Sequence, residues 1–310
     1  MVGDINSTKF KRWLAADAIR YLQDMPVWWR HVLNEQYETP SGEKRPLLIA
    51  LRDGKLDAYA GGHRVLRIGF KKTEVGVVPR CKLHWKFAEK SEAKGADVPV
   101  EPDEIIENLQ KWIKTALSHA PNKEKHGVAA IVHRHANVID VEMALPRDNT
   151  IQTCDSTGAP RMDIVALEGG ASVSRINLAF YEAKCFDNPS LRANDLRPEV
   201  FCQLKKYELY MADGERQKQV LRGYQSTCKI LRAISRMRGT QPHRLVEAVA
   251  DGAALNLDPR PRLIVFEYDA RRADVGSYWT RHWNALRENY CVIMSPQAKD
   301  ITLRSCRESC

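Results

Sequence analysis

Two charged residues, Glu182 and Lys184, lie two positions apart near the end of an apolar stretch that has the pattern of a β-strand. Residues two apart on a strand project to the same side, and burying such a charged pair without partners is unfavourable. Asp163 stands at the start of the preceding apolar segment, where hairpin pairing can bring it beside Glu182. Two adjacent carboxylates repel each other, and a hard divalent cation relieves this repulsion by binding both. The pattern predicts a Mg²⁺ or Mn²⁺ site with Lys184 in reach of a metal-bound water.

A polar pair on the next predicted helix, Gln203 and Tyr207, is spaced by four residues and therefore shares one helical face. If this helix packs beside the carboxylate edge of the sheet, both side chains can reach a scissile phosphate or a metal-bound water. A metal-activated water, a lysine that stabilises negative charge and polar groups near the phosphate are the parts of a phosphodiester hydrolase.

The order of acid, acid, lysine and polar helix pair resembles the PD-(D/E)xK nuclease superfamily, and the Gln-x-x-x-Tyr spacing is similar to its RecB-type branch. The resemblance covers about residues 120–270, where that superfamily has a helix, three strands, a helix and a further strand. Met162 stands in place of the proline of the literal motif, and the iron–sulfur cysteines of some RecB-type members have no counterpart. The resemblance implies metal-dependent hydrolysis of phosphodiester bonds, with catalytic roles for Asp163, Glu182, Lys184, Gln203 and Tyr207.

An acidic residue on the first helix of the core often completes the metal site in this superfamily. Glu124 is predicted here as the third metal ligand, beside Asp163 and Glu182. The sequence does not separate it from Glu107, which remains the alternative.

Other residues with metal-binding side chains have less specific spacing. Asp140 and Glu142 share one face of a predicted strand, and we expect a solvated face, with a supporting role at the metal site as the alternative. His133 and His135 are not accompanied by residues at the spacing of a zinc or HNH site, so we expect them at the surface or at a helix end.

A basic segment follows the predicted site. Residues 201–240 hold nine Lys and Arg against three Asp and Glu, which is most of the net charge of +9. Such an excess favours a polyanionic partner, and phosphate contacts position a duplex without reading its sequence. No aromatic stacking platform favours RNA. The residues expected to contact DNA are Lys205, Lys206, Arg216, Arg222, Lys229 and Arg232.

Hydrophobic periodicity indicates the elements that position these residues. In the N-terminal part, helices are predicted from Phe10 to Tyr21 and from Val27, followed by antiparallel strands around the Asp53-Gly54 and Gly61-Gly62 turns and by a linker at 89–103. From residue 101 the predicted order is helices, three strands, helices, strand, helix and strand, typical of an α/β domain with a mixed sheet. We therefore expect a small α+β module with its linker at 1–100, and a restriction-endonuclease-like mixed sheet flanked by helices at 101–310.

Composition restricts the class of protein. With 310 residues, 44% apolar and 28% charged, the chain is typical of globular proteins. Charged residues recur from Asp4 to Arg20, so a signal peptide is not expected, and no apolar run approaches the ~20 residues of a membrane span. The eight cysteines form no CxxC pair, and we expect them to be reduced and mostly buried in a cytoplasmic protein without membrane contact.

Together these features predict a Mg²⁺-dependent deoxyribonuclease, either endonuclease or exonuclease, acting in phage defence, restriction or repair. The alternative is a non-catalytic nucleic-acid-binding subunit in which the nuclease fold is degenerate. The expected partners are DNA, a protein such as a helicase or a sensor, and a second copy of the chain.

Overall fold

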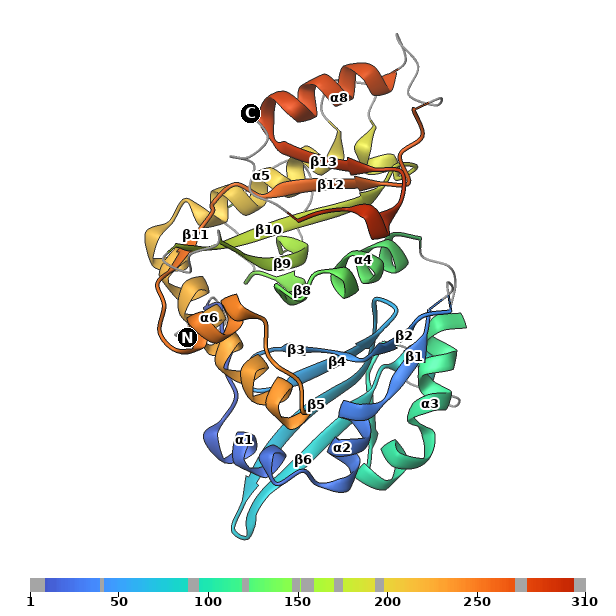
Figure 1. The fold of residues 1–310 in the computed structure, drawn as a ribbon, viewed down its shortest axis with the longest axis vertical. Helices are drawn as coiled ribbons and strands as arrows, with labels where there is room; N and C mark the ends of the chain where they lie inside the picture. The colour runs from blue at the N-terminus through green and yellow to red at the C-terminus, as the bar shows by residue number, and fades with distance from the viewer. Residues whose placement is uncertain are drawn as a thin grey trace, which may run out of the picture.

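The framework of the molecule is a pair of β-sheets, one built from the N-terminal part of the chain and one from the C-terminal part (Figure 1). The computed structural model describes residues 9–39, 42–88, 95–118, 123–146, 151, 159–169, 175–192, 198–270 and 278–303. This mixed architecture confirms the α/β class. No helix within these ranges is long and apolar enough to cross a membrane.

The N-terminal sheet is antiparallel throughout and follows chain order. After α1 (Ala16–Gln23) and α2 (Val27–Asn34), a two-stranded ribbon joins β1 (Gln36–Glu38) to β2 (Lys44–Pro46). The five-stranded sheet comprises β3 (Leu48–Leu51), β4 (Leu56–Ala60), β5 (His63–Thr73), β6 (Gly76–Leu83) and β7 (Val98–Val100). The predicted turns are confirmed, and Gly61 and Gly62 both adopt the positive φ that glycine tolerates. Strand β7 lies within the region expected to be a linker, of which residues 89–94 fall outside the described ranges.

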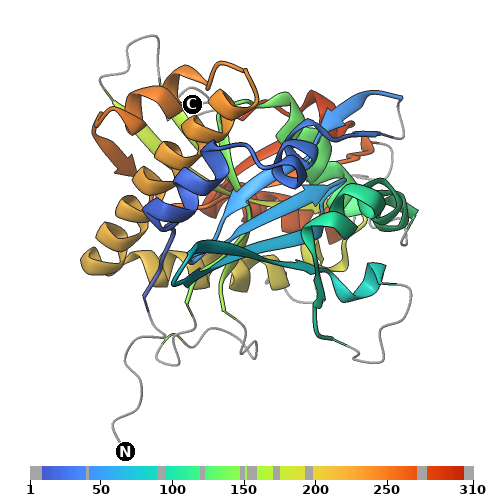
Figure 2. The ribbon, with the colours of Figure 1, turned by 90° about the horizontal axis from the view of Figure 1, so that it is seen from below.

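One face of this sheet is covered by three helices. Its core contains Trp29 of α2 and Leu66 and Ile68 of β5, together with residues of α3 (Pro102–Ser118). In Figure 2, α3 (teal) and the orange helices lie on opposite sides of the N-terminal strands. Although α3 follows the boundary expected at residue 100, its apolar stripe packs into the N-terminal core.

The second sheet is mixed and has the order β13-β12-β10-β9-β8. Strands β8 (Val138–Ala144), β9 (Arg161–Gly169) and β10 (Ile176–Cys185) are antiparallel neighbours. Three strands run parallel to their neighbours: β11 (Leu255–Leu257) and β12 (Arg262–Phe266) pair with β10, and β13 (Cys291–Ser295) pairs with β12. Strand β10 thus lies inside the sheet, as its nearly continuous apolar sequence predicts.

Helices cover both faces of the mixed sheet. Four of them contribute to the larger core on one face: α5 (Glu199–Met211), α6 (Gly214–Met237), α7 (Arg244–Ala250) and α8 (Tyr278–Asn289). On the other face lies α4 (Lys123–Arg134), where it meets Ala50 and Tyr59 of the N-terminal sheet. Figure 1 shows α4 between the two sheets.

The two modules are also joined along α6. Ile230 and Ile234 of α6 enter the N-terminal core, while Phe10 enters the core of the mixed sheet. A Cβ atom at Gly223 would lie 2.8 Å from the Phe10 ring, so glycine permits this close approach.

The cysteines differ in part from the expectation of reduced thiols. Cys81, Cys185 and Cys228 are free and buried, as expected. Cys202 on α5 and Cys291 at the start of β13 are disulfide-bonded. The sequence alone does not predict disulfide bonds here, because pairing depends on which cysteines the fold brings together.

Candidate metal and catalytic site

The β9–β10 hairpin brings Asp163 to the strand that carries Glu182 and Lys184. The ladder pairs Ile164 with Tyr181, and Asp163 Oδ2 accepts a hydrogen bond of 2.8 Å from the backbone N–H of Ala183. Hairpin pairing therefore positions the first predicted acid as the sequence indicated.

Glu182 and Lys184 form a buried ion pair in the middle of the sheet. They are 5% and 6% exposed, and their strand is hydrogen-bonded to β9 on one side and to β12 on the other. Lys184 Nζ lies 2.6 Å from Glu182 Oε1. A surface ion pair on an edge strand is thereby excluded, and the charged pair occupies a position where apolar residues would be more stable.

The third acid in contact with this pair is Glu124, in the first turn of α4. Its Oε1 lies 3.4 Å from Lys184 Nζ, and its other carboxylate oxygen accepts a hydrogen bond from Asn188. Glu107, by contrast, is exposed on α3, which packs in the other module. The structure thus separates the two candidates that the sequence left open.

Burial and mutual repulsion make these carboxyl groups reluctant to ionise. Burial raises the pKa of Asp163 to about 6, with further increases from Glu124 and Glu142 against the opposing effect of Lys184. Burial and the neighbouring Asp163 raise the pKa of Glu182 to about 8. Burial opposes the charge of Lys184, but the three carboxylates around it raise its pKa above the ordinary value. Lys184 is therefore a cation that only partly compensates its acidic neighbours.

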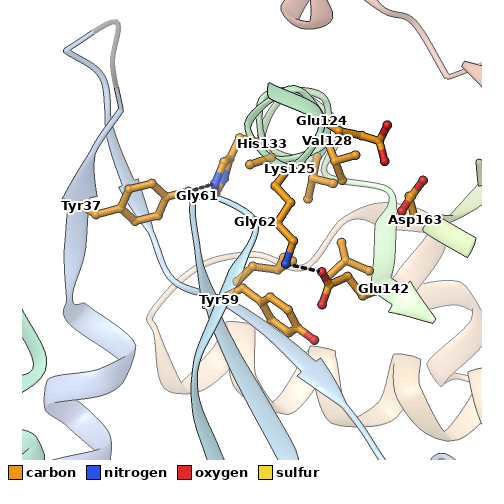
Figure 3. Close-up of a pocket in the computed structure, with 14 residues that line it drawn as sticks. Tyr37, Tyr59, Gly61, Gly62, Glu124, Lys125, Val128, His133, Glu142 and Asp163 are labelled. Carbon is orange, nitrogen blue, oxygen red and sulfur yellow. Dashed lines mark hydrogen bonds and ion pairs between the residues drawn. The ribbon is translucent and has the colours of Figure 1, made fainter. Parts of the chain in front are cut away.

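Asp163 and Glu124 line a cavity of about 110 Å³ between α4, β8 and the Gly61-Gly62 turn (Figure 3). Glu142 enters the same cavity and pairs with Lys125 at 3.1 Å. Its neighbours on β8 pair with Ile164 and Met162, which places Glu142 opposite Asp163. Glu142 also has a φ of 46°, unusual for a residue other than glycine, and such backbone strain is often found at functional sites.

Asp163, Glu182 and Glu124 all offer carboxylate oxygens, which are the ligands that a hard divalent cation prefers. Among the described residues, however, no group of three or more His, Cys, Asp and Glu converges in a metal-binding arrangement. Lys184 engages Glu182, and Asn188 engages Glu124. For one ion to bind all three acids, these two contacts have to be exchanged for contacts to the metal.

The helical pair occupies a more apolar environment than predicted. Tyr207 is fully buried in the larger core, with its ring 4.9 Å from that of Phe180. Gln203 Oε1 and the Tyr207 hydroxyl are both buried and have no hydrogen-bond partner among the described residues. The hydrogen bonds of the described residues therefore do not join this pair to Asp163, Glu182 or Lys184.

The six residues expected to contact DNA lie on α5 and α6 and have different environments. Lys206 is buried, and Lys205 pairs with Glu208 at 3.0 Å. Arg216 packs over the Tyr210 ring at 4.8 Å, and Arg232 pairs with Asp251. Arg222 and Lys229 are exposed on α6. None of the six lines the cavity that contains Asp163.

The prediction of a solvated Asp140 is wrong. Asp140 is 1% exposed and binds Arg12 at 3.1 Å, Arg52 at 2.5 Å and the Tyr224 hydroxyl at 3.0 Å. Because Arg12 and Arg52 belong to the N-terminal module and Tyr224 to α6, this carboxylate links the modules. A β-bulge beside Asp140 alters the alternation that the sequence pattern assumed.

The two histidines stand at the C-terminal end of α4, in agreement with the sequence. His133 contacts the Tyr37 hydroxyl, and His135 accepts a hydrogen bond from the backbone N–H of Leu303. Burial lowers the pKa of His133 to about 4. Both rings therefore support packing between elements.

Comparison of the chain with protein-family models, with curated proteins and with solved structures finds no significant match. The description of the site therefore rests on the geometry of this chain alone. The sequence did not identify Lys125 and Asn188 as residues of the site. The available signal was position alone: Lys125 follows Glu124, and Asn188 lies in the loop after Lys184.

Proposed function

We propose that the protein is a Mg²⁺- or Mn²⁺-dependent deoxyribonuclease with a restriction-endonuclease-like core. The observation that carries this proposal is the buried cluster of Asp163, Glu182 and Lys184 on two paired strands, with Glu124 in contact. A buried cluster with more acids than bases is unfavourable by itself, and a bound cation would stabilise it. The helix before the three strands and the helix after them have the order expected from the resemblance.

In this proposal Asp163, Glu182 and Glu124 hold the metal, which supplies Lewis acidity and an activated water when bound. Lys184 orients the nucleophilic water and stabilises negative charge on the phosphate. Asn188 positions Glu124, and Gln203 and Tyr207 lie on α5, from which Tyr207 supports the strand at Phe180. The setting is the cytoplasm, in restriction, phage defence or repair, with a helicase, a sensor or a second copy of the chain as possible assembly partners.

A cleavage assay tests this function. Supercoiled and linear duplex DNA, single-stranded DNA and RNA are incubated with Mg²⁺ or Mn²⁺ and the wild type, Glu182→Gln, Lys184→Met or the control Glu215→Gln. Glu215 is exposed on α6, outside the acid cluster. We expect metal-dependent DNA cleavage that falls at least about 100-fold in the two site variants and is unchanged in the control. Equal cleavage by Glu182→Gln and the wild type would contradict the proposal.

The second candidate is a nucleic-acid-binding subunit without catalysis. It is favoured by one observation, the ion pair through which Lys184 already compensates Glu182 at 2.6 Å. This candidate predicts DNA binding without cleavage and without metal binding that depends on Asp163.

A further inference from the structure

A large groove separates the N-terminal sheet from the mixed sheet. Its volume is about 760 Å³, and its walls come from β4, β5 and the turn after β6 on one side and from Ala144 and Arg161 on the other. Tyr59, Lys125 and Glu142 line both this groove and the cavity that contains Asp163 and Glu124. The groove therefore adjoins the cavity of the candidate site.

The groove is strongly basic. Eight Lys and Arg line it against three Asp and Glu. Part of this charge serves the fold: Arg52 binds Asp140, and Arg67 forms two hydrogen bonds with Asp57, at 2.8 and 2.9 Å. These arginines are compensated and do not need a further anion.

Three other basic side chains of the groove are not compensated in this way. Lys55, Lys86 and Arg161 are exposed and have no carboxylate partner among the described residues. Lys86 packs against the Trp85 ring at 5.5 Å. The three come from both walls of the groove, so uncompensated positive charge faces the groove from both sides.

The exposed face of the N-terminal sheet continues this positive charge. Leu66 and Ile68 point into the apolar core, so Arg67 points to the other face, where it stands directly opposite Lys82 on β6. Asp57 compensates the charge of Arg67, whereas the exposed Lys82 adds a further positive charge to this face.

We propose that this groove binds the phosphodiester backbone of DNA and leads a strand to the acid cluster, with Lys55, Lys86 and Arg161 contacting phosphates. Arg161 and Asp163 are two residues apart on β9 and share one face, a separation of about 7 Å along the strand. A phosphate held by Arg161 would thus lie next to the metal-binding acids. The inference rests on the proposed nuclease function for its ligand, and it gives the N-terminal module a role in binding substrate.

Binding measurements on the full chain test the groove. A fluorescein-labelled DNA duplex and the corresponding single strand are titrated in EDTA, so that cleavage does not interfere. The triple variant Lys55→Ser, Lys86→Ser, Arg161→Ser is compared with a control that loses the same charge on α6, namely Lys218→Ser, Arg222→Ser, Lys229→Ser. The control residues are exposed and do not line the groove, and Arg222 and Lys229 represent the competing α6 surface that the sequence suggested for DNA.

We expect the groove variant to lose at least about tenfold in affinity and the control less than about twofold. The slope of log affinity against log salt should decrease by about one for each phosphate contact removed. Wild-type affinity in a folded groove variant, or an equal loss in the control, would overturn the inference.

A footprint on the unmodified protein gives a second test that does not depend on the folding of a variant. Lysines are acylated with and without DNA, and the modified peptides are quantified by mass spectrometry. We expect DNA to protect Lys55 and Lys86 and to leave Lys218 and Lys229 reactive. Protection confined to Lys218 and Lys229 would overturn the inference and place DNA on α6.

These results separate the groove from the nuclease function. Cleavage by the wild type together with undiminished binding by the groove variant would refute the groove and leave the nuclease intact. Protection of Lys55 and Lys86 without any metal-dependent cleavage would support the groove and refute the nuclease.

Discussion

Two buried carboxylates on neighbouring strands of the mixed sheet have opposite electrostatic environments. Asp140 on β8 is held by two arginines and a tyrosine hydroxyl, and although burial opposes its ionisation, Arg52 and Arg12 lower its pKa below the ordinary value. On β9, Asp163 shares one lysine with Glu182 and Glu124, and burial raises its pKa to about 6. The first site is complete without a ligand, whereas the second carries an excess of negative charge. The difference separates a structural link between modules from a candidate site for a cation.

The largest change in stability is expected from removing the charge of Asp140. Asp140→Asn leaves two buried arginines without their counterion, and the loss of one partner of a buried ion pair is typically worth about 3–5 kcal/mol. We expect the free energy of unfolding to fall by this amount in urea denaturation. A loss below about 1 kcal/mol would show that Asp140 does not link the modules as described.

The corresponding substitution at the other carboxylate, Asp163→Asn, should increase the free energy of unfolding, whereas Asp140→Asn decreases it. At pH 8 without metal, Asp163→Asn removes a charge that burial disfavours, while the amide oxygen can still accept the hydrogen bond from Ala183 N–H. We expect a gain of about 1–3 kcal/mol in the free energy of unfolding. Destabilisation similar to that of Asp140→Asn would contradict the contrast between the two sites.

The dependence of stability on pH sharpens the comparison further. Because burial and Asp163 raise the pKa of Glu182 to about 8, the folded protein binds more protons than the unfolded chain between its ordinary pKa and pH 8. Stability of the metal-free protein should therefore fall as pH rises, by about 2 kcal/mol from pH 6 to pH 8. Melts of the wild type in EDTA and of Glu182→Gln check this, since the variant should lack the decline. A decline of the same size in both would exclude Glu182 as its source.

Local patterns predicted most of the elements around the site. The alternation of β10 and the hairpin with β9 correctly placed Asp163 beside Glu182 and Lys184. Short elements such as β7 were missed because a Val-Pro-Val segment beside polar sequence has no periodicity.

Features that depend on packing between distant segments could not be predicted from the sequence. Glu124 and Glu107 have equivalent local signals, and only the different packing of α4 and α3 separates them. The basic segment at 201–240 is conspicuous because its charges are consecutive. The charges of the groove, in contrast, come from positions such as Lys55 and Arg161 that only the fold brings together.

The most direct test of the cation site is the binding of Mn²⁺ to the full chain, followed by the electron paramagnetic resonance of free Mn²⁺ at pH 8. Wild type is compared with Asp163→Asn and with the exposed control Glu215→Gln. We expect Mn²⁺ binding by the wild type and the control and its loss in Asp163→Asn, whose fold should be intact because the change is stabilising. Absence of binding in the wild type, or equal binding in Asp163→Asn, would contradict the assignment of this cluster as a metal site.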